Sequence, residues 1–542
     1  MQEFLAGRYV AHAVLDQDIT ELLQLTFIDK AHELRNLLLF TCGCDSQAAD
    51  AVMEELCTLS SQTFQHIQPN VLIRKLLDRY EDVMFHYTEH AATYGGFLRL
   101  CLDLRKERNT PDVLQTVSRA LPVIILDIDE RREQLAGLEC YIEDIKASQV
   151  PIATRMILIL RKCKNFQDLE QIFASTVPGL RLDLKLLNGV EFSSTDQTVR
   201  LVSVLKNVPH LRSLILSGTE LTPSSLQPLV QGFSHVSMLE ELHITENKEL
   251  GDSGMEVLQV GLSSVPHLTV LRLRMVGMTS VGMSSMVPYM RHLVRLRELD
   301  VSDNKIGDSG LESLNTILPI FTAMQVLALG FNKITTTAMR TLVRTLRHLT
   351  GLIKLDISGN AIGDPGLECL AAILHHLTAM KVLVLMSTGI SDRGISALIK
   401  ALPYLVQLEV LDVCWNVIED AGLISLVETI CSLVREGNST LQVLSIGRNI
   451  PVTEAGLERI AQLTSTLPSL TTLTRYDRSD RNWDIHEFLS DTAAMSLAEA
   501  LPKLPHLLMM ELTFKAFDMH PAMFRQDVVQ DAEEHSTLEA LA

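Results

Sequence analysis

Few side chains in this chain of 542 residues have the types and spacing that enzyme chemistry requires. His486 and Glu487 begin the HExxH pattern, which places two zinc ligands and a general base on one helix, but Ser490 occupies the position of the second histidine. Cys101 and Asp103 are spaced as a thiol nucleophile and a neighbouring acid, yet they lie in the apolar helical run LRLCLDLRK, which is typical of a buried cysteine. The sequence therefore predicts no catalytic residue and no enzymatic activity.

The residue patterns of common cofactor sites are also missing from the sequence. No Gly-Lys dipeptide occurs, so there is no GxxxxGK[ST] loop to cradle nucleotide phosphates. Cys42 and Cys44 are the only close pair among nine cysteines, and no further ligands stand at the spacing of a zinc site. An odd number of cysteines without a CxxC pair indicates reduced, buried thiols in a cytoplasmic protein. We predict neither a metal nor another cofactor.

The charge balance bears on the class of partner. Lysine and arginine number 47 against 66 aspartate and glutamate residues, which gives a net charge of −19. An acidic chain of this kind argues against nucleic acids and anionic membranes as partners. No apolar run reaches the roughly 18 residues that a membrane-spanning helix needs. The first residues lack the basic and apolar segments of a signal peptide.

A short motif that recurs from about residue 180 predicts the architecture. It consists of an apolar residue, two others, a leucine, one other and a second apolar residue. Successive central leucines lie 28 or 29 residues apart, except for one interval of 33 that contains a polar insertion. Degenerate units are expected near residues 182–186 and 507–512. The central leucines are Leu214, Leu242, Leu271, Leu299, Leu327, Leu355, Leu383, Leu411, Leu444 and Leu473.

One unit, LRELDVSDNKIGDSGLESLNTILPIFTA from Leu296, shows what the repeat builds. Its first residues alternate as in a short strand, and Leu311, Leu314 and Leu318 then share one face of a helix. Because a single unit cannot bury its apolar side, stacked units form a parallel sheet on one side and a helix layer on the other.

An asparagine follows the central leucine by five residues in most units. Buried in a turn, its amide is expected to satisfy backbone groups of the adjacent unit, so its role is structural. The asparagines are Asn247, Asn304, Asn332, Asn360, Asn416 and Asn449.

The consensus LxxLxLxxNxIxDxGxxxL at this period resembles the leucine-rich repeat of the ribonuclease-inhibitor type. The resemblance implies an α/β horseshoe of about ten to twelve units over residues 179–515, followed by a tail at 516–542. Residues 1–178 lack the period and are punctuated by prolines, so we predict an all-α helical domain that packs on the first repeats.

Two N-terminal segments carry a second resemblance. QEFLAGRYV at 2–10 is similar to the end of the winged helix in NACHT–leucine-rich-repeat (NOD-like) receptors, and ELRNLLLFTCG at 33–43 is similar to their second helical domain. Without the phosphate-binding loop, the resemblance implies only the C-terminal portion of such a receptor: a winged-helix remnant, helical domain 2 and the repeats. It gives no ground for ATP binding by this chain.

In a repeat of this type the strand residues that flank the central leucine face the concave side. Two adjacent units place an apolar patch there, and an apolar cluster among polar columns suggests a contact site. The candidate patch comprises Val382, Val384, Met386, Val410 and Trp415, with Phe331 as an extension. Acidic residues at Asp300, Asp356 and Asp412, with Asp303 nearby, are predicted to steer a basic partner, and Arg272 and Arg274 form a spot of opposite sign.

Three functions remain open from the sequence. The first is a non-enzymatic interaction module of a NOD-like innate immune receptor that binds a protein ligand or the receptor's own nucleotide-binding domain. The second is a standalone scaffold or inhibitor of the ribonuclease-inhibitor kind. The third is a small-GTPase regulator, as in the Ran-activating family, although the tail from Lys515 carries only six acidic and two basic residues.

Overall fold

The computed structural model describes residues 166–177, 180–187 and 189–449, four strands outside these ranges, and scattered further positions. The chain divides into two compact units, one of Met1–Glu249 with Val260–Leu268 and one of Leu250–Gln259 with Thr269–Ala542. Most of residues 1–178 and all of residues 516–542 lie outside the described residues, so the predicted helical domain and tail stay predictions.

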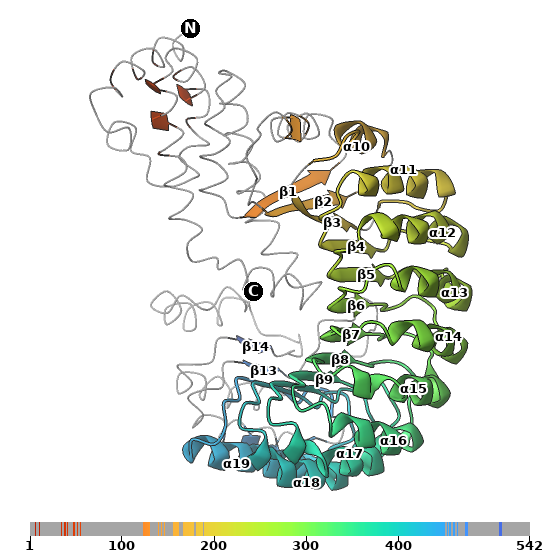
Figure 1. Cartoon of the computed structure of the whole chain (residues 1–542). Helices are drawn as coiled ribbons and strands as arrows, with labels where there is room; N and C mark the ends of the chain where they lie inside the picture. Colours follow the sequence, from red (N-terminus) through yellow and green to blue (C-terminus); the bar gives the residue numbers. More distant parts are fainter. Residues whose placement is uncertain are drawn as a thin grey trace, which may run out of the picture. The chain divides into compact units, whose positions relative to one another are not determined.

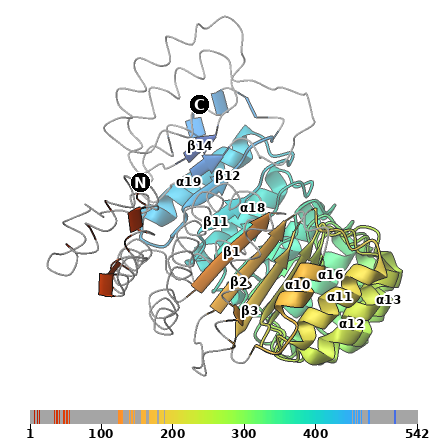
Figure 2. The same ribbon diagram turned by 90° about the horizontal axis from the view of Figure 1, so that it is seen from above.

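The first unit contains strands that pair in parallel in the order of the sequence (Figure 2). The central leucines are in register, since Leu184 pairs with Leu214 and Leu214 with Leu242. The strands are β1 (Val123–Asp129), β2 (Arg155–Arg161), β3 (Arg181–Leu186), β4 (Ser213–Ser217) and β5 (Glu241–Thr245).

Strands β1 and β2 correct the expectation that residues 1–178 are purely helical. The seven-residue segments VIILDID and RMILILR contain short apolar runs of four and five residues. Periodicity alone does not distinguish such a run from a buried helix, and here pairing with β3 decides in favour of a strand. Met156–Leu160 are all buried, so both faces of β2 are covered. The sheet therefore begins at Val123, before the predicted boundary at residue 179.

The second unit continues the same design with strands of three residues, each centred on the repeat's leucine or its equivalent, Met510, in β14. All neighbouring strands from β6 to β14 pair in parallel. The strands are β6 (Val270–Arg272), β7 (Glu298–Asp300), β8 (Val326–Ala328), β9 (Lys354–Asp356), β10 (Val382–Val384), β11 (Val410–Asp412), β12 (Val443–Ser445), β13 (Thr472–Thr474) and β14 (Met509–Glu511).

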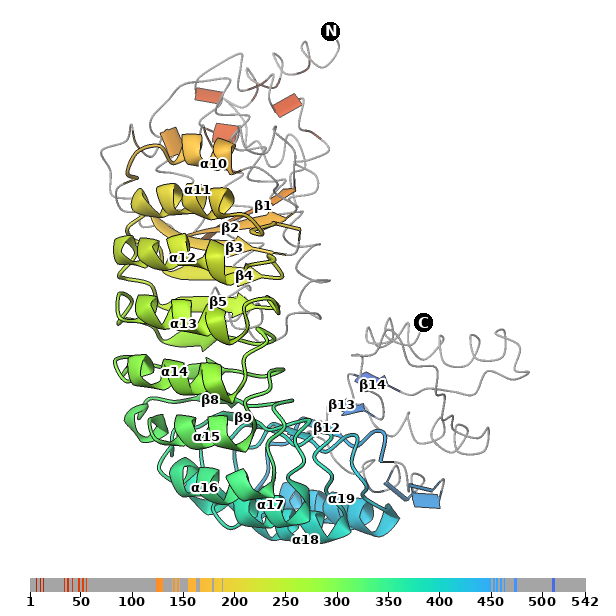
Figure 3. The same cartoon turned by 90° about the vertical axis from the view of Figure 1, so that its right-hand side faces the viewer.

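A helix follows most strands, and consecutive helices pack side by side along one face of each unit (Figures 1 and 3). Helix α13 (Gly251–Leu262) has residues in both units. Short 3₁₀ turns follow several helices at Phe233–His235, Leu318–Ile320, Leu374–His376 and Leu402–Tyr404. The other helices are α10 (Gln167–Ile172), α11 (Thr195–Lys206), α12 (Pro223–Gly232), α14 (Ser280–Met290), α15 (Gly307–Asn315), α16 (Thr336–Leu346), α17 (Gly363–Ala371), α18 (Asp392–Ala401) and α19 (Asp420–Arg435).

The apolar residues of the repeat form the core between the two layers. The central leucines of β6–β12 are fully buried, as are Leu311 and Leu314 of α15. Thr279, Thr335 and Ser391 cap the helices that follow them, each accepting a backbone N–H with its hydroxyl. The predicted repeat fold, with a parallel sheet on one side and helices on the other, is confirmed.

The widths of the two layers set the curvature of the second unit. Packed helices lie about 8–10 Å apart, whereas paired strands lie about 4.8 Å apart. The row of helices therefore follows the longer, outer path, and the strands lie on the inner side (Figure 1). Among the described residues, no helix combines the length and apolar character that crossing a bilayer would require.

Candidate protein-interaction surface

The inner face of the second unit, called the strand face below, consists of the residues that flank each central leucine in β6–β12. Nearly all of these flanking side chains are half-buried, whereas the leucines between them are buried. This alternation is what a strand with one packed and one open side requires. The two residues that flank each leucine are thus less buried than the leucine between them, and their role in binding stays a prediction.

The predicted apolar patch lies on neighbouring strands. Val382 of β10 and Val410 of β11 are direct cross-strand neighbours, while Val384 of β10 lies opposite Asp412. Met386 lies two residues beyond β10. The four apolar side chains, those of Val382, Val384, Met386 and Val410, are half-buried rather than fully exposed. The structure thus brings the patch together, with acidic and aliphatic residues side by side.

Phe331 and Trp415 extend this surface at the ends of β8 and β11, on backbone with φ of 53° and 56°. In this left-handed region a bulky residue costs roughly 1–2 kcal/mol. The two repeats between them have Gly359 and Ser387 at the same position, also with positive φ, so the conformation belongs to the repeat. The Phe331 ring is 42% exposed, and a Cβ on Gly359 would clash with it, so the ring lies against the next repeat. Trp415 is half-buried, with the Arg448 guanidinium 4.4 Å from its ring centroid.

The carboxylates of the strand face also have local partners. Asp300 and Asp412 each accept a hydrogen bond from the backbone N–H two residues on, at 2.9 Å. Asp356 accepts two bonds from Ser358, from N–H at 2.9 Å and from Oγ–H at 2.6 Å. Burial raises the pKa of Asp356 above its ordinary value, the Ser358 bonds oppose the shift, and the charge of Asp300 adds to it.

The predicted basic spot is internally compensated. Arg272 forms an ion pair with Glu298 of the next strand, and Arg274 Nε lies 2.6 Å from an Asp303 carboxylate oxygen. The partners are 26 and 29 residues away, about one repeat, which is why sequence spacing within a helix or strand does not reveal them. The charges of both arginines are therefore balanced by neighbouring acids, and Asp303 forms an ion pair with Arg274.

The repeated asparagines make the hydrogen bonds expected of them. Asn360 is 1% exposed. Its Oδ1 accepts from the N–H groups of Asn332 and Ile334 in the preceding repeat, at 3.0 and 2.9 Å. Its Nδ2 donates to the carbonyl of Leu329 at 2.9 Å and to two carbonyls of its own repeat. Corresponding bonds from the other amides link each repeat to the one before it, at Asn247, Asn304, Asn332, Asn416 and Asn449.

Comparison with known families supports this description. The family model described as "Leucine Rich repeat" matches residues 236–258, 295–314, 347–371 and 407–427. Ribonuclease inhibitor from Sus scrofa is 28% identical over 176 residues, which cover 31% of this chain and 38% of that protein. NLR family CARD domain-containing protein 4 from Rattus norvegicus is 26% identical over 195 residues, which cover 34% of this chain and 18% of that protein.

A third relative is the mouse (Mus musculus) NACHT, LRR and PYD domains-containing protein 12, 29% identical over 194 residues, or 35% of this chain and 18% of that protein. This chain carries leucine-rich repeats of the NOD-like-receptor and ribonuclease-inhibitor type. The matches span between 18% and 38% of these three relatives. Among solved structures, an internalin (inlF) from Listeria monocytogenes str. 4b F2365 aligns over 78% of this chain and 94% of its own, with 18% identity and a TM-score of 0.40.

A second set of side chains, with no role predicted from the sequence, links the leucine-rich repeats on the helix side. The Asp364 carboxylate accepts from Ser391 N–H and Oγ–H, both at 2.7 Å, and from Gly394 N–H at 3.0 Å. A Cβ on Gly394 would lie 2.6 Å from Asp364 Oδ1, so the glycine permits the approach. The Asp-x-Gly of the consensus is the signal that could have revealed it. Equivalent bonds are made by Asp252, Asp308, Asp392 and Asp420.

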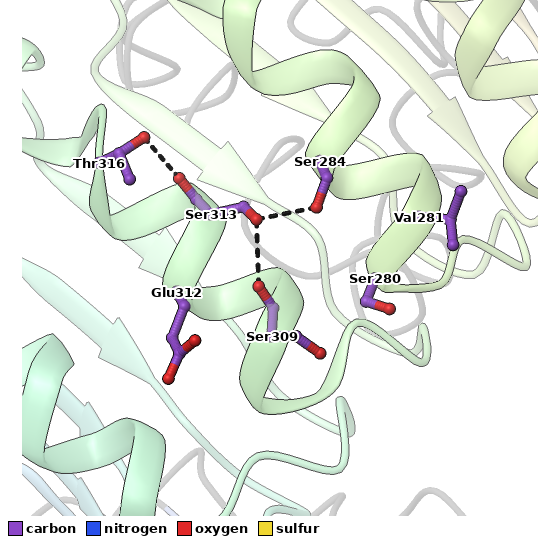
Figure 4. A pocket seen from close by; sticks show the side chains of 7 residues that line it. All are labelled: Ser280, Val281, Ser284, Ser309, Glu312, Ser313 and Thr316. Carbon is purple, nitrogen blue, oxygen red and sulfur yellow. Dashed lines mark hydrogen bonds between the residues drawn. The ribbon is translucent and has the colours of Figure 1, made fainter.

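A groove of about 630 Å³ lies between helices α14 and α15, on the helix side of the repeats (Figure 4). The hydroxyls of Ser284 and Ser313 lie 2.8 Å apart across it, and Ser313 also donates to the carbonyl of Ser309. The hydroxyls of Ser284, Ser313 and Thr316 are thus bonded within the protein. Among the described side chains, no three His, Cys, Asp or Glu groups are placed to share a metal ion. The strand face therefore remains the candidate site.

Proposed function

We propose that this chain is the ligand-sensing and autoregulatory part of a NOD-like innate immune receptor and acts by binding rather than by catalysis. The observation that carries the proposal is the strand face of β7–β11, where half-buried aliphatic side chains lie beside carboxylates and two aromatic residues extend from left-handed backbone. The left-handed conformation recurs at this position in each repeat from Gly218 to Arg448, so the large aromatic surface is what distinguishes Phe331 and Trp415. Similarity to two NOD-like-receptor repeat regions supports the choice of class.

The partner is a protein, either an external ligand or the receptor's own nucleotide-binding domain. Tryptophan is enriched at the centres of protein interfaces, and its rigid ring loses little entropy on binding. The net charge of −19 argues against a nucleic acid. We place this function in the cytoplasm, the compartment predicted from the cysteine pattern.

A second candidate is a standalone inhibitor or scaffold, and the match to ribonuclease inhibitor from Sus scrofa favours it. Such a protein would engage its target on the same strand face. The two candidates differ in the identity of the partner and not in the location of the contact.

Site-specific photo-crosslinking tests the proposal. Phe331 is replaced by benzoyl-phenylalanine, which keeps an aromatic ring at an exposed position; the matched control carries the same group at Val281 of α14, which is 61% exposed on the helix side. We expect a discrete protein adduct from position 331 that is absent from position 281 and is reduced by Trp415→Gly. Adducts of equal yield from both positions would contradict binding on the strand face.

The identity of the adduct separates the two candidates. An adduct with a nucleotide-binding domain supports the autoregulatory role. An adduct with a separate protein identifies an external ligand, and loss of that protein's own activity on binding would identify the inhibitor role.

A further inference from the structure

The strand face of β7–β11 presents one row of side chains that alternates in character from strand to strand. The strand registers place Asp300, Ala328, Asp356, Val384 and Asp412 side by side across five neighbouring strands. Every second strand therefore contributes a carboxylate, and the strands between them contribute an aliphatic side chain. The apolar neighbours in the adjoining column are Val326, Val382 and Val410.

The strand spacing fixes the distance between these carboxylates. Paired strands lie about 4.8 Å apart, so two strand steps separate neighbouring carboxylates by about 9.6 Å at the backbone. Because the strands lie on the inner side of the curved unit, the side-chain ends converge slightly below that value. A ligand that meets all three acids must repeat its cations at this distance.

Among regular peptide conformations, polyproline II fits this repeat best. It has three residues per turn and a rise of about 3.1 Å, so the same face recurs every 9.3 Å or so. An α-helix returns to one face after seven residues, or about 10.5 Å. In a β-strand, side chains on one face recur about every 6.7 Å, and every second one of them about every 13 Å, so neither distance matches the carboxylates. Because the carboxylates converge to slightly less than about 9.6 Å, the polyproline II repeat of about 9.3 Å fits them better than the α-helical repeat of about 10.5 Å.

The electrostatics of the row favour a cationic ligand. Arg272, which precedes the row, is paired with Glu298, and Lys354 is the one basic residue that β7–β11 contribute. Burial of Asp356 and the proximity of Asp300 raise the pKa of Asp356, which means that its charge is held at a cost in the unliganded face. A cation placed on Asp356 would offset that cost.

We propose that the strand face of β7–β11 binds a proline-rich segment in the polyproline II conformation, with an arginine or lysine at every third residue. Asp300, Asp356 and Asp412 each take one of three successive cations, and the residues between them contact Val384 and the valines of the adjoining column. Phe331 and Trp415 supply the aromatic surface on which polyproline II ligands pack. The inference rests on the proposed function, since it names the chemistry of the ligand for the same face.

Fluorescence anisotropy with the full chain and two labelled peptides of one composition tests the spacing. One peptide is Arg-Pro-Pro-Arg-Pro-Pro-Arg and the other is Arg-Arg-Arg-Pro-Pro-Pro-Pro. We expect the evenly spaced peptide to bind about tenfold tighter, since only it aligns each cation with a carboxylate. A third, alanine-based peptide carries arginines seven residues apart on a helix.

Two variants assign the effect to the row. Asp356→Asn keeps an acceptor for Ser358 and removes the charge; we expect it to weaken the spaced peptide about tenfold and the clustered peptide no more than about twofold. Glu312→Gln removes a charge from the exposed side of α15 and should leave both affinities unchanged. Melting temperatures no lower than that of the wild type show that both variants fold.

Equal affinity for the spaced and clustered peptides would overturn the proposal, because it indicates attraction by net charge alone. Equal effects of Asp356→Asn and Glu312→Gln would do the same, and tighter binding of the helical peptide would overturn the polyproline II conformation. If no peptide binds while crosslinking at Phe331 still gives its adduct, the cation repeat is wrong and protein binding at this face stands. If position 331 gives no adduct, the proposed function fails by its own test.

Discussion

Replacement of Asn360 by alanine tests whether the repeats are held together by side-chain amides. The Asn360 side chain is buried, and its Oδ1 accepts from the backbone N–H groups of Asn332 and Ile334. Alanine leaves both donors without this acceptor and removes the bond to the Leu329 carbonyl. A buried unsatisfied group costs about 1–3 kcal/mol, so the two donors alone predict a loss of about 2–6 kcal/mol. That is a large part of the stability of an ordinary domain.

Two measurements check this prediction. Urea unfolding gives the loss of stability, and because repeat proteins often unfold in parts, hydrogen exchange at the amides of Asn332 and Ile334 gives the local effect. Both amides should exchange much faster in Asn360→Ala than in the wild type, whereas amides in β3 and β4 should change less.

Thr388 provides the matched control, since threonine occupies the asparagine position naturally in the next repeat. Its Oγ1 donates to the Leu385 carbonyl at 2.7 Å. Asn360→Thr should therefore restore the bond within the repeat and give an intermediate stability. Asn438→Ala, at an exposed position, should change stability by less than about 0.5 kcal/mol. An Asn360→Ala protein that unfolds within about 1 kcal/mol of the wild type would refute the reasoning.

Three further outcomes follow from the same contacts. Asp364→Ala should lower the free energy of unfolding in urea by about 2–4 kcal/mol, because its charge-assisted hydrogen bonds are lost. Gly394→Ala should destabilise the protein when Asp364 is present but far less in the Asp364→Ala background, and a double-mutant cycle measures the difference. Trp415→Gly should leave thermal stability within about 1 kcal/mol, because relief of left-handed strain offsets the lost contact with Arg448. The raised pKa of Asp356 means that the folded state holds this proton more tightly than the unfolded chain, so ionisation costs stability as pH rises through about 4 and above. Asp356→Asn should lack this loss and be at least as stable as the wild type at pH 7, and a less stable variant at pH 7 would contradict the burial argument.

Much of the candidate site could be predicted because each short repeat carries its own orientation signal. A leucine at the centre of a three-residue strand buries itself and thereby turns both neighbours, such as Val382 and Val384, to the open side. The buried amides were predictable for a related reason, since an asparagine that recurs in a turn has backbone groups to satisfy. The exposed area of the patch was harder to predict. Exposure depends on what lies across from a side chain, and Trp415 is partly covered by Arg448 from the following repeat.

The period, the alternation of buried and open positions, and the residues of the strand face can be read from the order of the amino acids. These follow from local chemistry: the apolar spacing within a repeat specifies a strand and then a helix. The strands at Val123–Asp129 and Arg155–Arg161 emerge only from packing, because a short apolar run takes its conformation from the neighbour that pairs with it. Packing likewise decides that Arg272 is neutralised by Glu298, that Asp364 supports the next helix, and that three aspartates share one row. The paired residues lie about one repeat apart in the sequence, and successive aspartates of the row lie two repeats apart. The stacking of repeats brings each set together.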